Sequence, residues 1–223
     1  MNTTQDPFEQ YIKSLAAVLA KPLPGLAAQL RMSPAGRVDT NYESTPDYAR
    51  RSAVLIFLYN GGAGRVFFPA IVRIANGSSH SGQIALPGGG AEPGESFPIE
   101  TALREAREEV GLDSEFVNVL GTLTPLYIPV SNNSVTPVVA VSQHGTRPPL
   151  IRDAREVQEI IDLSVEALSS ERSERLFDTP LGPVQAPCYL PVDGKGVQRC
   201  VWGATAMILA EFLACHEAAV SLA

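Results

Sequence analysis

A glycine-rich stretch that runs directly into a glutamate-rich one constrains this chain more than any other feature. Residues 86–112 read LPGGGAEPGESFPIETALREAREEVGL. Ser96 is a good helix N-cap, Pro98 suits the first turn, and Gly111 stands where a left-handed residue would end a helix. The segment therefore predicts a tight loop that leads into a helix beginning near Ser96 and ending before Gly111.

Three glutamates would share one side of this helix. At 100° per residue, Glu108 and Glu109 fall about 60° and 40° to either side of Glu105. Arg104 is four residues before Glu108 and close enough to pair with it. Carboxylates gathered in this way are typical of proteins that hold a divalent cation against a phosphate.

Glutamates on one helix face also occur on ordinary solvated helices, which is the alternative interpretation. The glycine-rich loop favours the metal-binding interpretation, and so does an apolar arc that adjoins the acidic arc instead of opposing it. Glu100 and Arg107 are expected to face solvent. The residues expected to face the core are Ile99, Ala102, Leu103, Ala106 and Val110.

Residues 90–112 resemble the conserved box of the Nudix hydrolases, which is Gly, five residues, Glu, seven residues, then Arg-Glu-apolar-x-Glu-Glu-x-Gly-apolar. Gly90 and residues 104–112 match, whereas Ser96 replaces the first glutamate, whose role could pass to the adjacent Glu95 or lapse in favour of capping. The resemblance implies an α/β/α sandwich with a mixed central sheet. It also implies Mg²⁺ or Mn²⁺ held by the glutamates and oriented by arginine; the residues concerned are Arg104, Glu105, Glu108 and Glu109.

A narrower resemblance, to the coenzyme A pyrophosphatase branch, covers roughly residues 50–215. It rests on HSGQIALPGG at 80–89, TALREA at 101–106, LTPLYIP at 123–129, VTPVV at 135–139, Glu-Val at 156–157 and VWGATA at 201–206. Members of the branch often lack the first box glutamate too. This chain departs from the branch's LTxRS segment, because Arg73 is out of place within IVRIANGS at 71–78.

The resemblance implies metal-dependent hydrolysis of a diphosphate linkage in a nucleotide substrate, with coenzyme A or its thioesters as the first candidate. Glu108, Glu109 or Glu156, which precedes a later strand, would be the catalytic base, although a charged loop residue is usually only solvated. The candidate substrate-binding residues are His80, Gln83, Gly88, Gly89 and Gly90. His80 could instead cap its loop, and the three glycines could form a simple tight turn.

Two alternatives stay open. A Nudix pyrophosphatase could act on ADP-ribose, dinucleoside polyphosphates or nucleoside triphosphates, and a non-catalytic nucleotide-binding protein could use the same fold. The net charge of −7 argues against nucleic-acid and anionic-membrane partners. No apolar run approaches the ~20 residues that span a bilayer.

The cysteines and the N-terminal residues indicate the compartment, and the order of the expected helices and strands indicates the domain organisation. Three cysteines without CxxC spacing, and a start that lacks signal-peptide features, predict a reduced, cytoplasmic protein. Residues 1–45 are expected to form a helix at 7–20 and a linker that covers the site, pairs with a second copy in a homodimer, or only packs. Residues 46–223 are expected to form the Nudix domain. Strands are expected at 53–58, 66–72, 116–128, 135–142, 157–163, 185–190 and 198–201, with helices at 165–168 and 203–219. The first two strands are expected to form a hairpin about residues 60–62, the next two to be joined by a polar turn at 131–134, and the last two to form a hairpin about residues 193–196.

Overall fold

The first long strand is buried on both faces, and this explains the layered architecture. The computed structural model describes residues 6–34, 45–62, 64–74, 82–170, 172–179 and 182–222. In strand β1 (Arg50–Asn60), Leu55 and Phe57 belong to one buried apolar cluster, whereas Ile56 and Leu58 belong to another. Successive strand residues point to opposite faces, so both faces of the sheet at β1 are buried.

The central sheet is mixed and has β1 at its middle. β1 runs parallel to β7 (Asn133–Ser142) and antiparallel to β2 (Val66–Arg73) and β4 (Gly88–Gly90). The remaining strands are β3 (Ile84–Ala85) and β8 (Val157–Ser164), which pair with β2, and β5 (Val117–Thr122) and β6 (Leu126–Ile128), which pair with β7. Hairpin pairing of Asn60 with Val66 confirms the predicted turn between β1 and β2.

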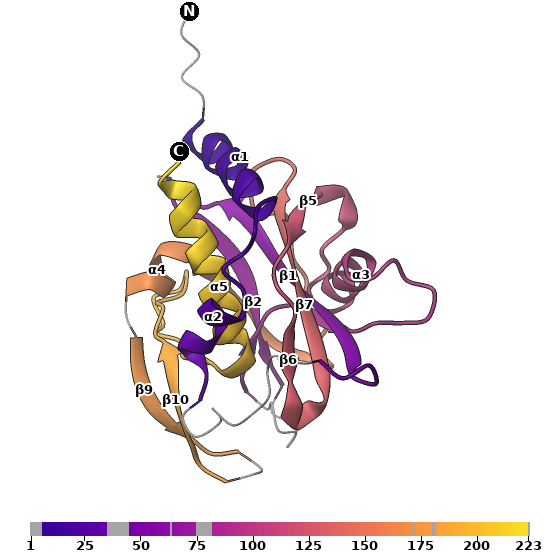
Figure 1. Ribbon diagram of the computed structural model, residues 1–223. Coiled ribbons are helices and arrows are strands. Elements are labelled where there is room, and N and C mark those ends of the chain that lie inside the picture. The colour runs from indigo at the N-terminus through magenta and orange to yellow at the C-terminus, as the bar shows by residue number, and fades with distance from the viewer. Residues whose placement is uncertain are drawn as a thin grey trace, which may run out of the picture.

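Helices cover both faces of this sheet (Figure 1). Helix α3 (Ile99–Val110) packs on one face. On the other lie α1 (Pro7–Leu19), α2 (Leu26–Gln29), the short helix η1 (Leu30–Met32) and α5 (Gly203–Val220). The predicted α/β/α sandwich with a mixed sheet is therefore confirmed.

Two details of the strand prediction were wrong. The expected strand at 116–128 begins with the short helix η2 (Ser114–Phe116) and is divided into β5 and β6. The polar turn expected at 131–134 lies earlier, in η3 (Pro129–Ser131) and the left-handed Asn132. Its asparagine tolerates the positive φ of 47° better than most residues.

A second, three-stranded sheet follows α4 (Val165–Ser170) and consists of β9 (Arg172–Phe177), β10 (Val184–Tyr189) and β11 (Val201–Trp202). The pairing of β10 with β11 confirms the predicted hairpin. β9 was not predicted, because its sequence RSERLF is mostly polar and exposed on both faces. Such a strand carries no alternation for a period-two search to detect.

The described part of the N-terminal segment shares its core with the rest of the chain. Phe8, Tyr11, Leu15 and Met32 belong to the apolar cluster that also contains α5. Packing is seen in these contacts, and Pro34 of the same segment also lines the cavity described below, so the role of residues 1–45 stays a prediction. The division of the chain at residue 45 stays a prediction.

Helix α5 is apolar because it is a core helix. Its 18 residues have a mean hydropathy of 1.3, long and apolar enough by composition to cross a membrane, so the expectation that no run approaches that length was wrong. However, 56% of this window is buried within the fold, against the sheet and α1. A helix buried in this way passes the same test of length and composition.

The ends of α3 follow the prediction only in part. Gly111 is left-handed at φ 67°, as expected. The helix begins at Ile99 with no side-chain cap, so Ser96 is not its N-cap; the Ser96 N–H instead donates to the Glu100 carboxylate. Ile99 is 41% exposed and does not face the core, because it stands at the first, outer turn.

Candidate active site

Helix α3 turns its acidic side toward the glycine strand β4 because its small apolar side chains are fully buried against the sheet. Ala102, Ala106 and Val110 have no exposed surface. Glu105 and Glu109 therefore lie beside β4, with 16% and 2% of their side chains exposed. Glu108 points outward, and 59% of its side chain is exposed.

Arg104 ties this helix to the loop before it. Its Nε donates to Glu95 at 2.6 Å, and its Nη2 donates to the Gly90 carbonyl at 2.8 Å. Its Nη1 lies 3.0 Å from Glu105 and 3.1 Å from Glu108. The predicted pairing of Arg104 with Glu108 is confirmed, and the guanidinium reaches Glu105 as well.

Glu95 is the carboxylate next to Ser96, which stands at the position of the missing first box glutamate. Besides Arg104, its carboxylate accepts a hydrogen bond from the Thr101 hydroxyl at 2.6 Å. The hydrogen bond from Arg104, helped by Thr101, lowers the pKa of Glu95 to about 2. Of the two roles suggested for this position, the contacts favour transfer to Glu95, since Ser96 does not cap the helix.

Glu109 is a buried carboxylate held by the backbone of β4. It accepts the Gly88 N–H at 2.8 Å and lies 3.8 Å from the Arg73 guanidinium. The pKa of Glu109 is raised to about 7, mainly by burial and also by the charges of Glu105 and Glu156, against the opposing effects of the Gly88 N–H and Arg73. Burial also raises the pKa of Glu105, again with repulsion from neighbouring carboxylates.

These carboxylates do not form a finished ligand set. Within the described ranges of the chain, no three acidic, histidine or cysteine side chains are grouped so as to hold a metal ion. Glu105 is bonded to Arg104 and Glu109 to Gly88. The three metal-binding assignments therefore stay predictions.

The residues nevertheless suit a divalent cation by chemistry. Carboxylate oxygens are the hard ligands that Mg²⁺ and Mn²⁺ take, and a nearby cation would offset the repulsion that raises the pKa values of Glu105 and Glu109. Gly89 keeps space open beside them. A Cβ added at Gly89 would lie 2.4 Å from the Glu105 carboxylate.

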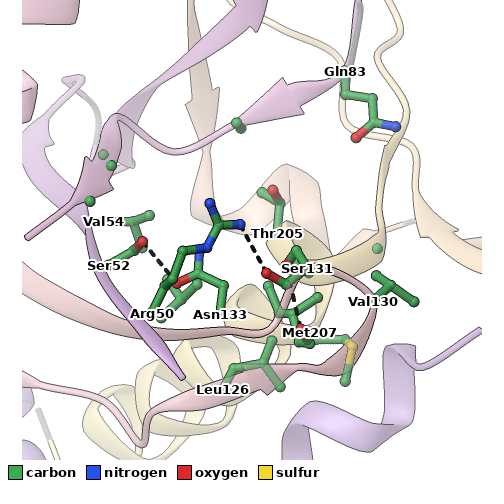
Figure 2. Close-up of a pocket in the computed structure, with 18 of the residues that line it drawn as sticks. Arg50, Ser52, Val54, Gln83, Leu126, Val130, Ser131, Asn133, Thr205 and Met207 are labelled. Carbon is green, nitrogen blue, oxygen red and sulfur yellow. Dashed lines mark hydrogen bonds between the residues drawn. The ribbon is translucent and has the colours of Figure 1, made fainter. Parts of the chain in front are cut away.

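A cavity of about 950 Å³ borders the glycines of β4. β4 lines the cavity and also contacts Glu109 and Arg104, so it connects the two. Figure 2 shows side chains from β1, β7 and α5 around the space. Its lining includes Arg50, Arg51 and Arg73 but no Asp or Glu in the described part of the chain. An acidic molecule thus presents a basic cavity, which suits an anionic ligand.

The predicted site residues fall into three groups. Gln83 and the three glycines of β4 line the cavity. Glu105 and Glu109 adjoin it through β4, whereas Glu108 points outward and contacts Arg104. Glu156 is exposed just before β8, near enough to raise the pKa values of Glu105 and Glu109. His80 lies outside the described residues.

Several cavity residues were missed by sequence reasoning. Arg50, Ser131, Asn133 and Thr205 line the cavity from four different segments. The sequence signals were the pair of arginines at the start of β1 and the VWGATA motif that contains Thr205. Arg73, noted as out of place in its motif, also lines the cavity.

Comparisons with known proteins agree with this geometry. Residues 49–181 match the family model of the NUDIX domain. The chain is 31% identical to Nudix hydrolase 15, mitochondrial, of Arabidopsis thaliana over 161 residues, 72% of this chain and 56% of that protein. It is 37% identical to the uncharacterized Nudix hydrolase NudL of Pectobacterium atrosepticum over 137 residues, 61% of this chain and 68% of that protein.

Among solved structures, the chain is similar to the Nudix hydrolase RenU of M. smegmatis, with 23% identity and a TM-score of 0.46 over 54% of this chain and 74% of that one. The chain spans little more than half the length of the Arabidopsis protein. The family model, in contrast, covers more than half of this chain. The chain therefore belongs to the Nudix hydrolase family.

Proposed function

We propose that this protein is a metal-dependent pyrophosphatase that cleaves the diphosphate of a nucleoside diphosphate derivative. Coenzyme A or one of its thioesters is the proposed substrate, with 3′,5′-ADP and a phosphopantetheine as products. The observation that carries the proposal is the position of β4, whose glycines contact Glu105, Glu109 and Arg104 and also line a basic cavity.

Glu105, Glu108 and Glu109 would hold Mg²⁺ or Mn²⁺. When bound, the ion would supply charge neutralisation at the diphosphate and an activated water. Arg104 keeps Glu105 and Glu108 together through its Nη1 donor. Gly88–Gly90 let the substrate approach the backbone closely, and Arg73 faces the diphosphate from the cavity side.

The proton of the attacking water needs an acceptor, for which Glu108, Glu109 and Glu156 are the candidates. Glu156 forms no ion pair with another described residue, and its charge raises the pKa values of both Glu105 and Glu109. We propose it as the base because it is the one of the three that the metal does not require. The role would be supported if the pH–rate profile of Glu156→Gln lacked the rise in rate that accompanies deprotonation of the base.

The cavity supports a long substrate with unlike ends. It is large for a small-molecule site, where about 300–1,000 Å³ is usual. Apolar side chains line it beside the arginines; they are Val54, Leu126, Ile128, Val130, Val135 and Met207. A nucleotide joined through a diphosphate to a mostly uncharged arm matches this division.

Hydrolysis assays with Mg²⁺ test the proposal over coenzyme A, ADP-ribose, dinucleoside polyphosphates and nucleoside triphosphates. We expect coenzyme A or a thioester to be cut fastest, and Glu108→Gln to lower turnover by at least ~10²-fold. Because Glu108 is 59% exposed, the variant should still fold. Glu100→Gln, on the solvent side of the same helix, is the matched control.

Each other result has a definite meaning. Cleavage of ADP-ribose with coenzyme A left intact would replace the proposed substrate. Nucleotide binding without any cleavage would favour the non-catalytic alternative. Full activity of Glu108→Gln would remove the proposed metal role.

We also propose a reducing, cytoplasmic setting. Cys188, Cys200 and Cys215 are all free thiols, and the first and last of them are buried. A homodimer stays a proposal that the solution mass would test.

A further inference from the structure

Arg50 lines the cavity at a position separate from β4, the strand proposed to contact the diphosphate. Along β1, Arg50, Ser52 and Val54 alternate with Arg51 and Ala53, so they share the face that looks toward α5. Figure 2 shows the Arg50 guanidinium reaching into the space between Ser52 and Thr205. The side chain is exposed within this cavity.

The other two cavity arginines are engaged nearer α3. Arg73 lies 3.8 Å from Glu109, and Arg51 lies over the Phe97 ring at 3.9 Å. Arg50 makes no ion pair with any residue in the described part of the chain. Among the three cavity arginines, it is the one that neither pairs with a carboxylate nor stacks on an aromatic ring of the described residues.

The donors around Arg50 are also oriented for an acceptor. Its Nη2 donates to the Ser131 carbonyl at 2.9 Å, which fixes the guanidinium while a guanidinium has five N–H donors in all. Asn133 is the register partner of Arg50, and its Oδ1 accepts from Ser52 at 2.9 Å. With the oxygen bonded, the Asn133 amide N–H₂ is the group left to face a ligand.

The strand register gives the distance along β1 between Arg50 and the residues that pair with the glycines of β4. Ser52 pairs with Gly90 and Val54 with Gly88, so Arg50 is two residues beyond the last glycine of β4. Two residues along a strand span about 7 Å. A ribose ring bridges a separation of this order between its 5′-diphosphate and a phosphate on its secondary hydroxyls.

We propose that Arg50 and Asn133 bind a second anionic group of the substrate, a phosphomonoester on the ribose that is separate from the scissile diphosphate. This assignment rests on the proposed function, since it uses β4 as the diphosphate end. Arg50 is thus a specificity residue: it distinguishes phosphorylated from unphosphorylated nucleosides and touches none of the reacting atoms.

Paired substrates test the assignment directly. Steady-state kinetics should compare coenzyme A with 3′-dephospho-coenzyme A in the wild type and in Arg50→Gln. We expect the wild type to prefer coenzyme A by about 10- to 100-fold in kcat/KM, mainly through KM, the range of one charge-assisted contact. Arg50→Gln should lose this preference while cleaving the dephospho substrate as the wild type does. Arg107→Gln, exposed on α3, is the charge-matched control.

A binding measurement separates failure of this inference from failure of the proposed function. Calorimetry with 3′,5′-ADP and 5′-AMP needs no turnover, and Arg50→Gln should weaken only the first. A parallel titration with 2′,5′-ADP identifies the ring position. Equal affinity for the mono- and bisphosphates, or an equal loss for both in Arg50→Gln, would overturn the inference. Absence of hydrolysis with the binding difference preserved would instead overturn the proposed function.

Discussion

Gly89 shows how a single missing side chain shapes the candidate active site. It lies where β4 passes closest to the Glu105 carboxylate. Any larger residue would occupy the space next to a proposed metal ligand. The glycine is therefore required by close approach, and its neighbour Gly90 provides a comparison because a Cβ there would meet nothing within 4 Å.

We predict that Gly89→Ala lowers kcat by about 10- to 100-fold and that Gly90→Ala, whose methyl group would meet no protein atom within 4 Å, lowers it less. The new methyl group would lie 2.4 Å from the Glu105 carboxylate and must displace it, and misplacement by about 1 Å can cost this much in rate. Glu105 is a flexible side chain that can move, so melting temperatures should change little. Equal rates for the two variants would contradict the proposed position of Glu105.

Glu109 makes stability depend on pH in a defined direction. Its pKa is about 7 in the fold against an ordinary 4.5, so the folded state binds the proton more tightly. The resulting stabilisation is complete below about pH 4.5 and is lost as the pH rises through 7. A carboxylate in a solvated position would show no such loss.

Glu109→Gln should remove this dependence in metal-free buffer, because the amide resembles the protonated acid. Relative to the variant, the wild type should lose about 3 kcal/mol of unfolding free energy between pH 4.5 and 8, as the shift implies. Urea unfolding in EDTA measures the difference at each pH. A constant difference across this range would contradict the raised pKa of Glu109.

At the scale of elements, one buried carboxylate joins α5 to the N-terminal segment. Glu211 has no exposed surface and accepts hydrogen bonds from the Gly25 N–H at 3.0 Å, the Gln29 amide at 2.8 Å and the Thr124 hydroxyl at 2.6 Å. It thereby links α2, the connection between β5 and β6, and the core helix. A carboxylate with several donors offsets its own desolvation.

We predict that Glu211→Ala lowers the unfolding free energy by about 3 kcal/mol, since several buried donors lose their acceptor at once. Glu217→Ala, exposed on the same helix, should change it by less than about 0.5 kcal/mol. Chemical denaturation followed by circular dichroism measures both. If the two variants unfolded alike, the N-terminal segment would not depend on this contact.

At the scale of the whole molecule, the sandwich brings together groups that the sequence keeps far apart. The helix α3, its left-handed Gly111 and its glutamate side were predictable because periodicity and capping are local. Arg50 and Asn133 were not, because their proximity comes from the parallel pairing of β1 with β7. The cavity likewise requires the N-terminal end of α5 to meet β1, a tertiary contact without a local signal.

The central claim is that Glu105, Glu108 and Glu109 bind one divalent cation beside β4. Anomalous diffraction from a crystal soaked in Mn²⁺ with a non-hydrolysable diphosphate tests it most directly. We predict a peak within about 2.5 Å of oxygens from these three carboxylates and next to the diphosphate. A well-ordered diphosphate in the cavity with no peak there, or a peak on other residues, would contradict it.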